Sequence, residues 1–375
     1  MFTSHSRRLP APNAGKAAHR KFLASAMVLS LLACGEKTHE SNTGSDDVGT
    51  AQQPLVCGGS GSGSTGGIAD AQKGAYVVLM GGTQTVGNAL KPYGMVYDLV
   101  KNLQIPVLWA YRTNKTSNTQ VDFTVDGIDI VGGTFVIPSS YANLPAVKTA
   151  LARWQAAGVV LYGPTKAAFT PPTYFQRITG FPNIVLDPQN GYIAQGYLTA
   201  AGLPTFPVRY PSNLDSCNDM FVMPHADPTW ANHGNLLAFV QSGGFLWSGC
   251  HAPSVLEALD GPTPDGAPDM NFLTSTGLIH YKSHSQASPP YTAALFGDPL
   301  MQFVGLLDGA LQNGSEQVYL PLLAGAWRQS TKIVLSAPTQ VDFVAGRSPG
   351  PAAKIAYGRA FGDPAAGVVM SPGSH

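Results

Sequence analysis

The chain has 375 residues, no net formal charge and a charged fraction of only 12%. This length favours two domains over a single core. The neutral balance leaves no basic stripe for nucleic acid and argues against electrostatic capture of a strongly charged partner.

The N-terminus has the pattern of a targeting segment. Basic residues precede an apolar run, Phe22–Ala33, which has the length of a signal-peptide core and is too short to span a bilayer. The run ends in Leu31-Leu32-Ala33-Cys34-Gly35, which resembles the bacterial lipobox. The resemblance implies a signal peptide over residues 1–33 and a membrane anchor through lipid on Cys34. The alternative is an ordinary signal peptide with an incidental cysteine.

Because Gly35 rather than aspartate follows Cys34, retention in the inner membrane is not signalled. The predicted location is therefore the cell envelope, at the outer membrane or the periplasmic face. Residues 34–73 are rich in Gly, Ser, Thr, Asn and Asp. Such a segment buries too little apolar area to fold, so it is predicted to be a flexible tether.

Residues 74–180 alternate strand-like and helix-like patterns, which predicts a first α/β domain with a largely parallel sheet. The expected strands cover 76–80, 105–110, 121–130, 135–137 and 159–162, and the expected helices cover 93–103 and 144–157. The run 121–130 alternates apolar and polar residues, as a half-buried or edge strand does.

The pattern restarts near residue 182, which predicts a second domain over 181–375. Its expected strands cover 183–186, 206–209, 220–223, 245–247, 318–323, 332–336, 341–344 and 367–370, and its helices 193–201, 235–242 and 253–259. Residues 260–292 are predicted to be a long loop. The expected fold class is α/β, with two tandem flavodoxin-like three-layer α/β/α domains and mainly parallel sheets.

Two segments, 135–163 and 221–249, align with each other without a gap. Each has a short apolar run ending in proline, a helix-like stretch, a glycine, a second apolar run and a closing glycine. The first copy continues as Pro164-Thr165 and the second as Cys250-His251. The common pattern is explained by the requirements of folding the same local structure, but the thiol and the imidazole are not. These two side chains lie at the carboxyl end of a strand, where open α/β sheets bind their ligands.

The chain has four cysteines: Cys34, Cys57, Cys217 and Cys250. With Cys34 lipidated, three are left, so one disulfide and one remaining thiol are expected in an oxidising compartment. A Cys57–Cys217 bridge would leave Cys250 as the thiol. A Cys217–Cys250 bridge is the open alternative.

The segment 220–256 resembles the class I glutamine amidotransferase-like superfamily, especially its DJ/PfpI and ThuA-like branches. The strand, the turn Gly249-Cys250-His251-Ala252-Pro253 and the following helix carry the resemblance, together with an upstream apolar strand and Gly243-Gly244. It implies that Cys250 is a nucleophile and His251 its base. It also implies His375 as a rival base, in a C-terminal strand similar to the ThuA-like pattern.

The chain departs from the superfamily in two places. His225-Ala226 replaces the glycines whose backbone helps to bind an oxyanion, and the amidotransferase His-x-Glu motif has no full match. The acidic residue that contacts the thiol is expected to be Asp187, with Asp227 as an alternative. A helix N-terminus at Cys250 would favour the thiolate and lower the pKa of the thiol.

His225, Asp227 and His233 follow the strand that ends at Met223, so they are expected to line a pocket beside Cys250. With His280 and His284 they could instead bind a metal. Because the segment 278–286 is not strongly helical and no cysteine pair supports zinc, no metal is predicted. No cofactor is expected, since no dinucleotide fingerprint opens a helix after a strand.

The sequence therefore predicts an envelope lipoprotein with a cysteine hydrolase domain that acts on an amide or ester of an unknown small molecule or peptide. The alternative is a non-catalytic binding or scaffold lipoprotein that retains the fold. The Cys-His turn favours the enzyme, and the altered oxyanion turn favours the scaffold.

Overall fold

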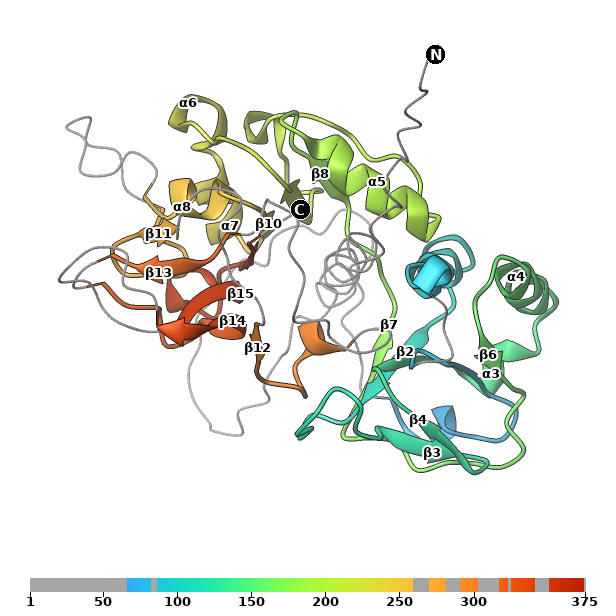
Figure 1. Cartoon of the computed structure of the whole chain (residues 1–375). Helices are drawn as coiled ribbons and strands as arrows, with labels where there is room; N and C mark the ends of the chain where they lie inside the picture. The colour runs from blue at the N-terminus through green and yellow to red at the C-terminus, as the bar shows by residue number, and fades with distance from the viewer. Residues whose placement is uncertain are drawn as a thin grey trace, which may run out of the picture.

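The computed structural model describes residues 66–81, 86–258, 270–280, 291–302, 317–322, 325–340 and 351–373. Its strands fall into two main sheets, which form separate lobes in Figure 1. The first lobe holds the early part of the chain, mostly in blue and green, and the second holds the later part, from the yellow-green of β8 to red. The two lobes explain why the pattern of elements restarts in the middle of the sequence.

The first sheet has the strand order β6-β1-β5-β2-β7. Its bounds are β1 Tyr76–Val78, β2 Val107–Tyr111, β5 Thr134–Ile137, β6 Leu161–Tyr162 and β7 Tyr174–Ile178. Every pairing within it is antiparallel. The expectation of a parallel sheet in this half is therefore wrong. The sequence pattern showed strands alternating with helices, but it did not reveal strand β7. It also did not reveal that β1 and β2 run antiparallel to the strands beside them.

The helices of this half are α2 Lys91–Tyr97, continued by the π-helix Asp98–Asn102, α3 Ser139–Ala142 and α4 Pro145–Ala156. Helix α4 buries Val147, Ala150, Leu151 and Trp154, at the spacing of one helical face. The run 121–130, expected to be one strand, is instead the hairpin β3 Phe123–Val125 and β4 Ile128–Ile130. Asp126 and Gly127 both have positive φ, as a two-residue turn of the mirror-image type requires.

The second sheet runs in the order β11-β13-β15-β16-β10-β9-β8, with β14 paired to β15 and β12 to β14. Its bounds are β8 Ile184–Leu186, β9 Met220–Met223, β10 Phe245–Ser248, β11 Leu278–His280, β12 Thr292–Ala293, β13 Tyr319–Pro321, β14 Lys332–Gln340, β15 Pro351–Arg359 and β16 Val368–Pro372. Strands β8, β9, β10 and β16 are mutually parallel, and Val208 adds a parallel bridge on the far side of β8. The remaining pairings are antiparallel.

The helices of this half are α5 Gly191–Ala201, α6 Trp230–His233, α7 Leu236–Gln241 and α8 Ala252–Leu256. Short 3-10 turns cover Ile68–Asp70, Val86–Asn88, Pro211–Asn213, Pro299–Met301 and Ala360–Gly362. Mixed α and β content with partly parallel sheets makes the chain an α/β protein. Within the segments that the structure covers, no helix has both the length and the apolar character needed to cross a membrane.

The two aligned segments form the same local unit in different surroundings. In the second copy, β9 and β10 are parallel neighbours joined through α6 and α7. In the first copy, β5 and β6 both pair antiparallel with β1, which lies between them. The shared pattern therefore encodes a strand, a helix and a second strand. It does not encode whether the two strands pair with each other or with a third strand between them.

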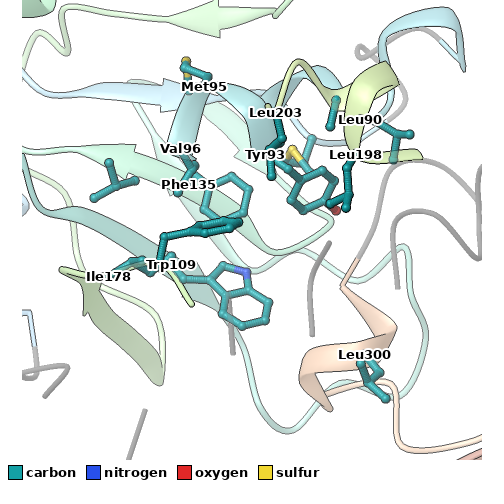
Figure 2. Packing of buried hydrophobic residues seen from close by; sticks show 14 of the residues in the cluster. Leu90, Tyr93, Met95, Val96, Trp109, Phe135, Ile178, Leu198, Leu203 and Leu300 are labelled. Carbon is teal, nitrogen blue, oxygen red and sulfur yellow. The ribbon is translucent and has the colours of Figure 1, made fainter. Parts of the chain in front are cut away.

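One hydrophobic core joins the two halves. It extends from Val78 on β1 to Met370 on β16. Figure 2 shows Tyr93 of α2 beside Leu198 of α5 and Leu203, so the two helices pack against each other. The chain passes from the first sheet to the second between Ile178 and Ile184.

The packed chain begins earlier than predicted. Residues 66–73, expected to be the end of the tether, lie against the first sheet: Ala71 is fully buried, and Asp70 forms an ion pair with Arg177 on β7 at 2.7 Å. The earlier residues of the predicted tether and signal peptide lie outside the described part of the chain. Residues 66–73 therefore belong to the packed part of the chain.

Candidate functional site

The carboxyl ends of β8, β9 and β10 bring the predicted site residues to one edge of the second sheet. Asp187 follows β8, His225 lies two residues after β9, and Cys250 lies two residues after β10. The ends of β9 and β10 approach closely, because the Gly249 N–H donates to the Met223 carbonyl at 2.8 Å. A Cβ on Gly249 would lie 2.3 Å from the Pro224 oxygen, so only glycine fits there.

Cys250 has a strained backbone. Its φ is 53°, in the left-handed region that β-carbon-bearing residues avoid. Its N–H donates to the Pro372 carbonyl at 3.2 Å, and its own carbonyl accepts from the Tyr319 hydroxyl. A strained residue between a strand and a helix is typical of nucleophile turns, where it lifts the reacting atom away from both elements.

The Cys250 side chain carries a thiol and is completely buried. Cys217 is disulfide-bonded, so the Cys217–Cys250 alternative is wrong. Burial raises the pKa of the Cys250 thiol to about 11. The His251 backbone N–H, which donates to the sulfur, and the nearby Lys354 act in the opposite direction and lower this pKa. The expected lowering of this pKa is therefore wrong, because desolvation outweighs the helix N-terminus.

His251 lies against two predicted pocket residues. Its Nε2 is 2.7 Å from the Asp227 carboxylate, and its side chain is only 16% exposed while that of Asp227 is 84% exposed. The rings of His225 and His251 meet edge to face, with centroids 4.6 Å apart. A ligating atom from each of His225, Cys250 and His251 lies within 4.8 Å of the other two. A thiol, two imidazoles and a carboxylate thus converge here.

Asp187 and His233 form a separate buried pair. His233 Nε2 lies 2.8 Å from Asp187 Oδ2, and both side chains are fully buried. The Thr229 N–H donates to His233 Nδ1 at 3.1 Å, so the ring proton is on Nε2 and is donated to Asp187. The other Asp187 oxygen accepts from the Gln189 N–H at 2.6 Å. Asp187 therefore ties α6 to the end of β8, and Asp227 is the acid that contacts His251.

The structure reveals a buried lysine near the thiol that the sequence analysis missed. Lys354 on β15 is buried, and its Nζ donates to the Gly373 carbonyl at 3.0 Å. Burial holds the pKa of this ammonium well below its usual range, while Cys250 acts to raise it. The available signal was a single lysine inside the apolar run 352–356.

Several predicted residues lie outside the described part of the chain. These are the rival base His375, the lipidation site Cys34 and the loop residue His284, together with the side chain of His280. No protein-family model matches the chain, and no curated protein or solved structure matches it.

Proposed function

We propose that the protein is a cysteine-dependent hydrolase acting on an amide or ester. The observation that carries the proposal is a strained thiol residue whose neighbour, His251, is paired with a carboxylate. His251 accepts the Cys250 proton as sulfur bonds to the substrate carbonyl carbon. Asp227 orients the ring, and the His251 backbone N–H stabilises negative charge at the reacting centre. The leaving group departs with the proton, and water then hydrolyses the acyl-enzyme.

The high pKa of the thiol shapes this mechanism. Cys250 starts as a neutral thiol, so its proton must pass to the imidazole before or during the attack. A bound substrate would exclude water from the turn. Hydrogen-bond donors would then stabilise the negative charge that develops during the attack, whereas the thiolate of the resting protein would gain no such stabilisation. This arrangement suits a general-base mechanism better than a preformed thiolate–imidazolium pair.

We further propose that residues 181–375 form a flavodoxin-like domain related to the class I glutamine amidotransferase-like superfamily, in its DJ/PfpI and ThuA-like branches. The parallel strands support this, because taken with the bridge at Val208 their order in the sheet is second, first, third, fourth and fifth along the chain. That order is typical of flavodoxin-like folds, which bind ligands at the carboxyl ends of the strands.

We also propose that the protein is a bacterial envelope lipoprotein, anchored through Cys34 at the outer membrane or the periplasmic face. The signal-like N-terminus supports this, and so does the disulfide at Cys217, since disulfides persist in oxidising compartments. Nucleic acid is not an expected partner of a chain with neutral charge balance.

The test is a screen of the full chain against ester and amide substrates, with Cys250→Ala and Asp227→Asn as variants. Cys250→Ala should abolish turnover, and Asp227→Asn should lower kcat on the order of tenfold to a hundredfold while the protein stays folded. Asp129→Asn on β4 is the matched control for an exposed carboxylate and should leave kcat unchanged. Full turnover by Cys250→Ala would rule out the nucleophile.

The second candidate is a non-catalytic binding or scaffold lipoprotein. The specific observation that favours it is the complete burial of Cys250, which leaves the sulfur inaccessible in this conformation. The replacement of the glycine turn by His225-Ala226 points the same way. This function is the conclusion if no substrate in the screen depends on Cys250.

A further inference from the structure

We infer that His225, Cys250 and His251 form a binding site for one borderline-soft divalent metal ion of the zinc class. In the part of the chain that the structure describes, they are the one set of three His, Cys, Asp or Glu residues whose ligating atoms converge, within 4.8 Å of one another. Ligands of a tetrahedral zinc ion are about 3.3–3.8 Å apart. Side-chain movements of about 1 Å would therefore close the three donors around an ion.

The types of donor select the metal. One sulfur and two imidazole nitrogens suit zinc and similar transition metals, whereas magnesium and calcium prefer oxygen ligands. Three protein ligands leave a fourth tetrahedral position for water or a small anion. The site thus differs from the one that the sequence alone suggested, which combined His225 with Asp227, His233 and two loop histidines.

Hydrogen bonds to the backbone hold the segments that carry these ligands close together. The Asn190 side-chain amide donates to the His225 carbonyl at 2.9 Å, which ties the loop after β9 to the start of α5. The Gly249 N–H donates to the Met223 carbonyl, which joins the second ligand-bearing turn to the same loop. Little loop ordering would be needed on binding, which favours a measurable affinity.

Asp227 adds the outer contact that metal-binding histidines commonly make. Its carboxylate lies 2.7 Å from His251 Nε2, so His251 would bind the ion through Nδ1. A carboxylate in this position orients the ring and makes the nitrogen a stronger donor. The exposed Asp227 side chain also places negative charge beside His251.

Binding would change the chemistry of Cys250. The S–H bond breaks, a sulfur–metal bond forms, and the proton passes to solvent. The sulfur lone pair is then held by the ion, so metal-loaded protein should be inert toward thiol reagents. The metal site does not depend on the hydrolase proposal, because it requires only the three donors. If both are correct, zinc inhibits the enzyme and a chelator restores it.

The test is a titration of the chelator-treated full chain with Co²⁺, monitored by ultraviolet and visible absorption spectroscopy. One equivalent of Co²⁺ should produce a thiolate-to-cobalt charge-transfer band and intense visible bands of tetrahedral cobalt, and Zn²⁺ should displace it. Cys250→Ser should abolish the charge-transfer band. His225→Ala and His251→Ala should each weaken binding at least about tenfold. His39→Ala, a matched loss of imidazole in the predicted tether, should bind as the original chain does.

Two results would overturn the site. One is the absence of a saturable band near one equivalent, and the other is unchanged affinity in both His225→Ala and His251→Ala. If Cys250→Ser does not fold, the affinity of His225→Ala for cobalt tests the site instead. This variant is expected to fold, because the His225 backbone carbonyl that accepts from Asn190 is still present. Both readouts follow metal rather than turnover, so a failure of the hydrolase proposal leaves them interpretable.

Discussion

At position 250, two physical effects oppose each other. The His251 N–H and the nearby Lys354 amine, where it is protonated, favour the thiolate, whereas complete burial favours the neutral thiol. Burial is the larger effect and raises the pKa of the thiol to about 11. A strand–helix turn is therefore not sufficient for an activated thiol, because a lowered pKa also requires the sulfur to be partly solvated or paired with a cation.

This balance predicts slow alkylation of Cys250 in the folded, chelator-treated chain. Because the pKa is about 11 rather than the ordinary 9.0, the thiolate fraction at neutral pH should be about a hundredfold lower than in an unperturbed thiol. The measurement is the rate of iodoacetamide modification of the Cys250 peptide as a function of pH, by mass spectrometry. The same peptide in urea is the control. A rate that levels off below pH 9.0 in the folded chain would contradict the burial argument.

At the scale of elements, the carboxylate of Glu257 connects α8 to the segment that precedes β11. Glu257 is fully buried and accepts hydrogen bonds from the Leu273 N–H at 2.9 Å and from the Thr274 N–H and hydroxyl at 2.9 and 2.6 Å. Burial raises the pKa of this carboxyl from 4.5 to about 7, although the three donors act to lower it. This contact fixes where α8, which follows the Cys-His turn, meets the rest of the sheet.

Glu257 should make stability depend on pH. Between its unfolded pKa of 4.5 and its folded pKa of about 7, the unfolded chain has released a proton that the folded chain retains. The free energy of unfolding should therefore fall as pH rises through this window, by about 3 kcal/mol from this group. The stabilisation is fully present below the lower pKa and is lost as pH passes the higher one.

The measurement is urea unfolding of the full chain and of Glu257→Gln across that window. The variant should show a flatter pH profile, because glutamine does not titrate. Asp129→Asn is the control, since Asp129 is exposed on β4 and should leave the profile unchanged. Parallel profiles for Glu257→Gln and the original chain would show that Glu257 does not titrate in this window.

At the scale of the whole molecule, the contact between α2 and α5 joins the two lobes. Gly94 lies in α2, and a Cβ there would be 1.8 Å from the Ala201 carbonyl oxygen and 2.8 Å from the Trp154 ring. The close approach lets Tyr93 reach the side chains of α5 (Figure 2). Because the core is continuous across this contact, the two halves should unfold together.

Gly94→Ala should therefore destabilise the whole chain, by about 1–3 kcal/mol, since α2 and α5 must separate to accommodate the methyl group. The measurement is the urea midpoint followed by tryptophan fluorescence and far-ultraviolet circular dichroism. Gly196→Ala is the matched control, because Gly196 lies in α5 with open space around its Cβ position. That change should raise stability by about 0.5–1 kcal/mol. Equal midpoints for the two variants would show that the helices do not depend on this approach.

The sequence alone determined the local elements and the position of the turn that carries Cys250 and His251. Apolar runs at 76–80, 220–223 and 245–247 and the helical spacing of 144–157 correspond to β1, β9, β10 and α4, because side-chain periodicity reports local backbone geometry. The residues Cys250, His251, His225 and Asp227 were predicted to meet, since they follow neighbouring parallel strands.

Only the tertiary structure decided how those elements combine. Strand direction in the first sheet, the pairing of Asp187 with His233 and the burial of Lys354 all depend on contacts between residues far apart in the chain. The pKa of Cys250 depends on the solvent that those contacts exclude. Periodicity encodes which face of an element is apolar, but pairing and desolvation are properties of the assembled fold, so the state of the thiol could not be predicted from the turn that carries it.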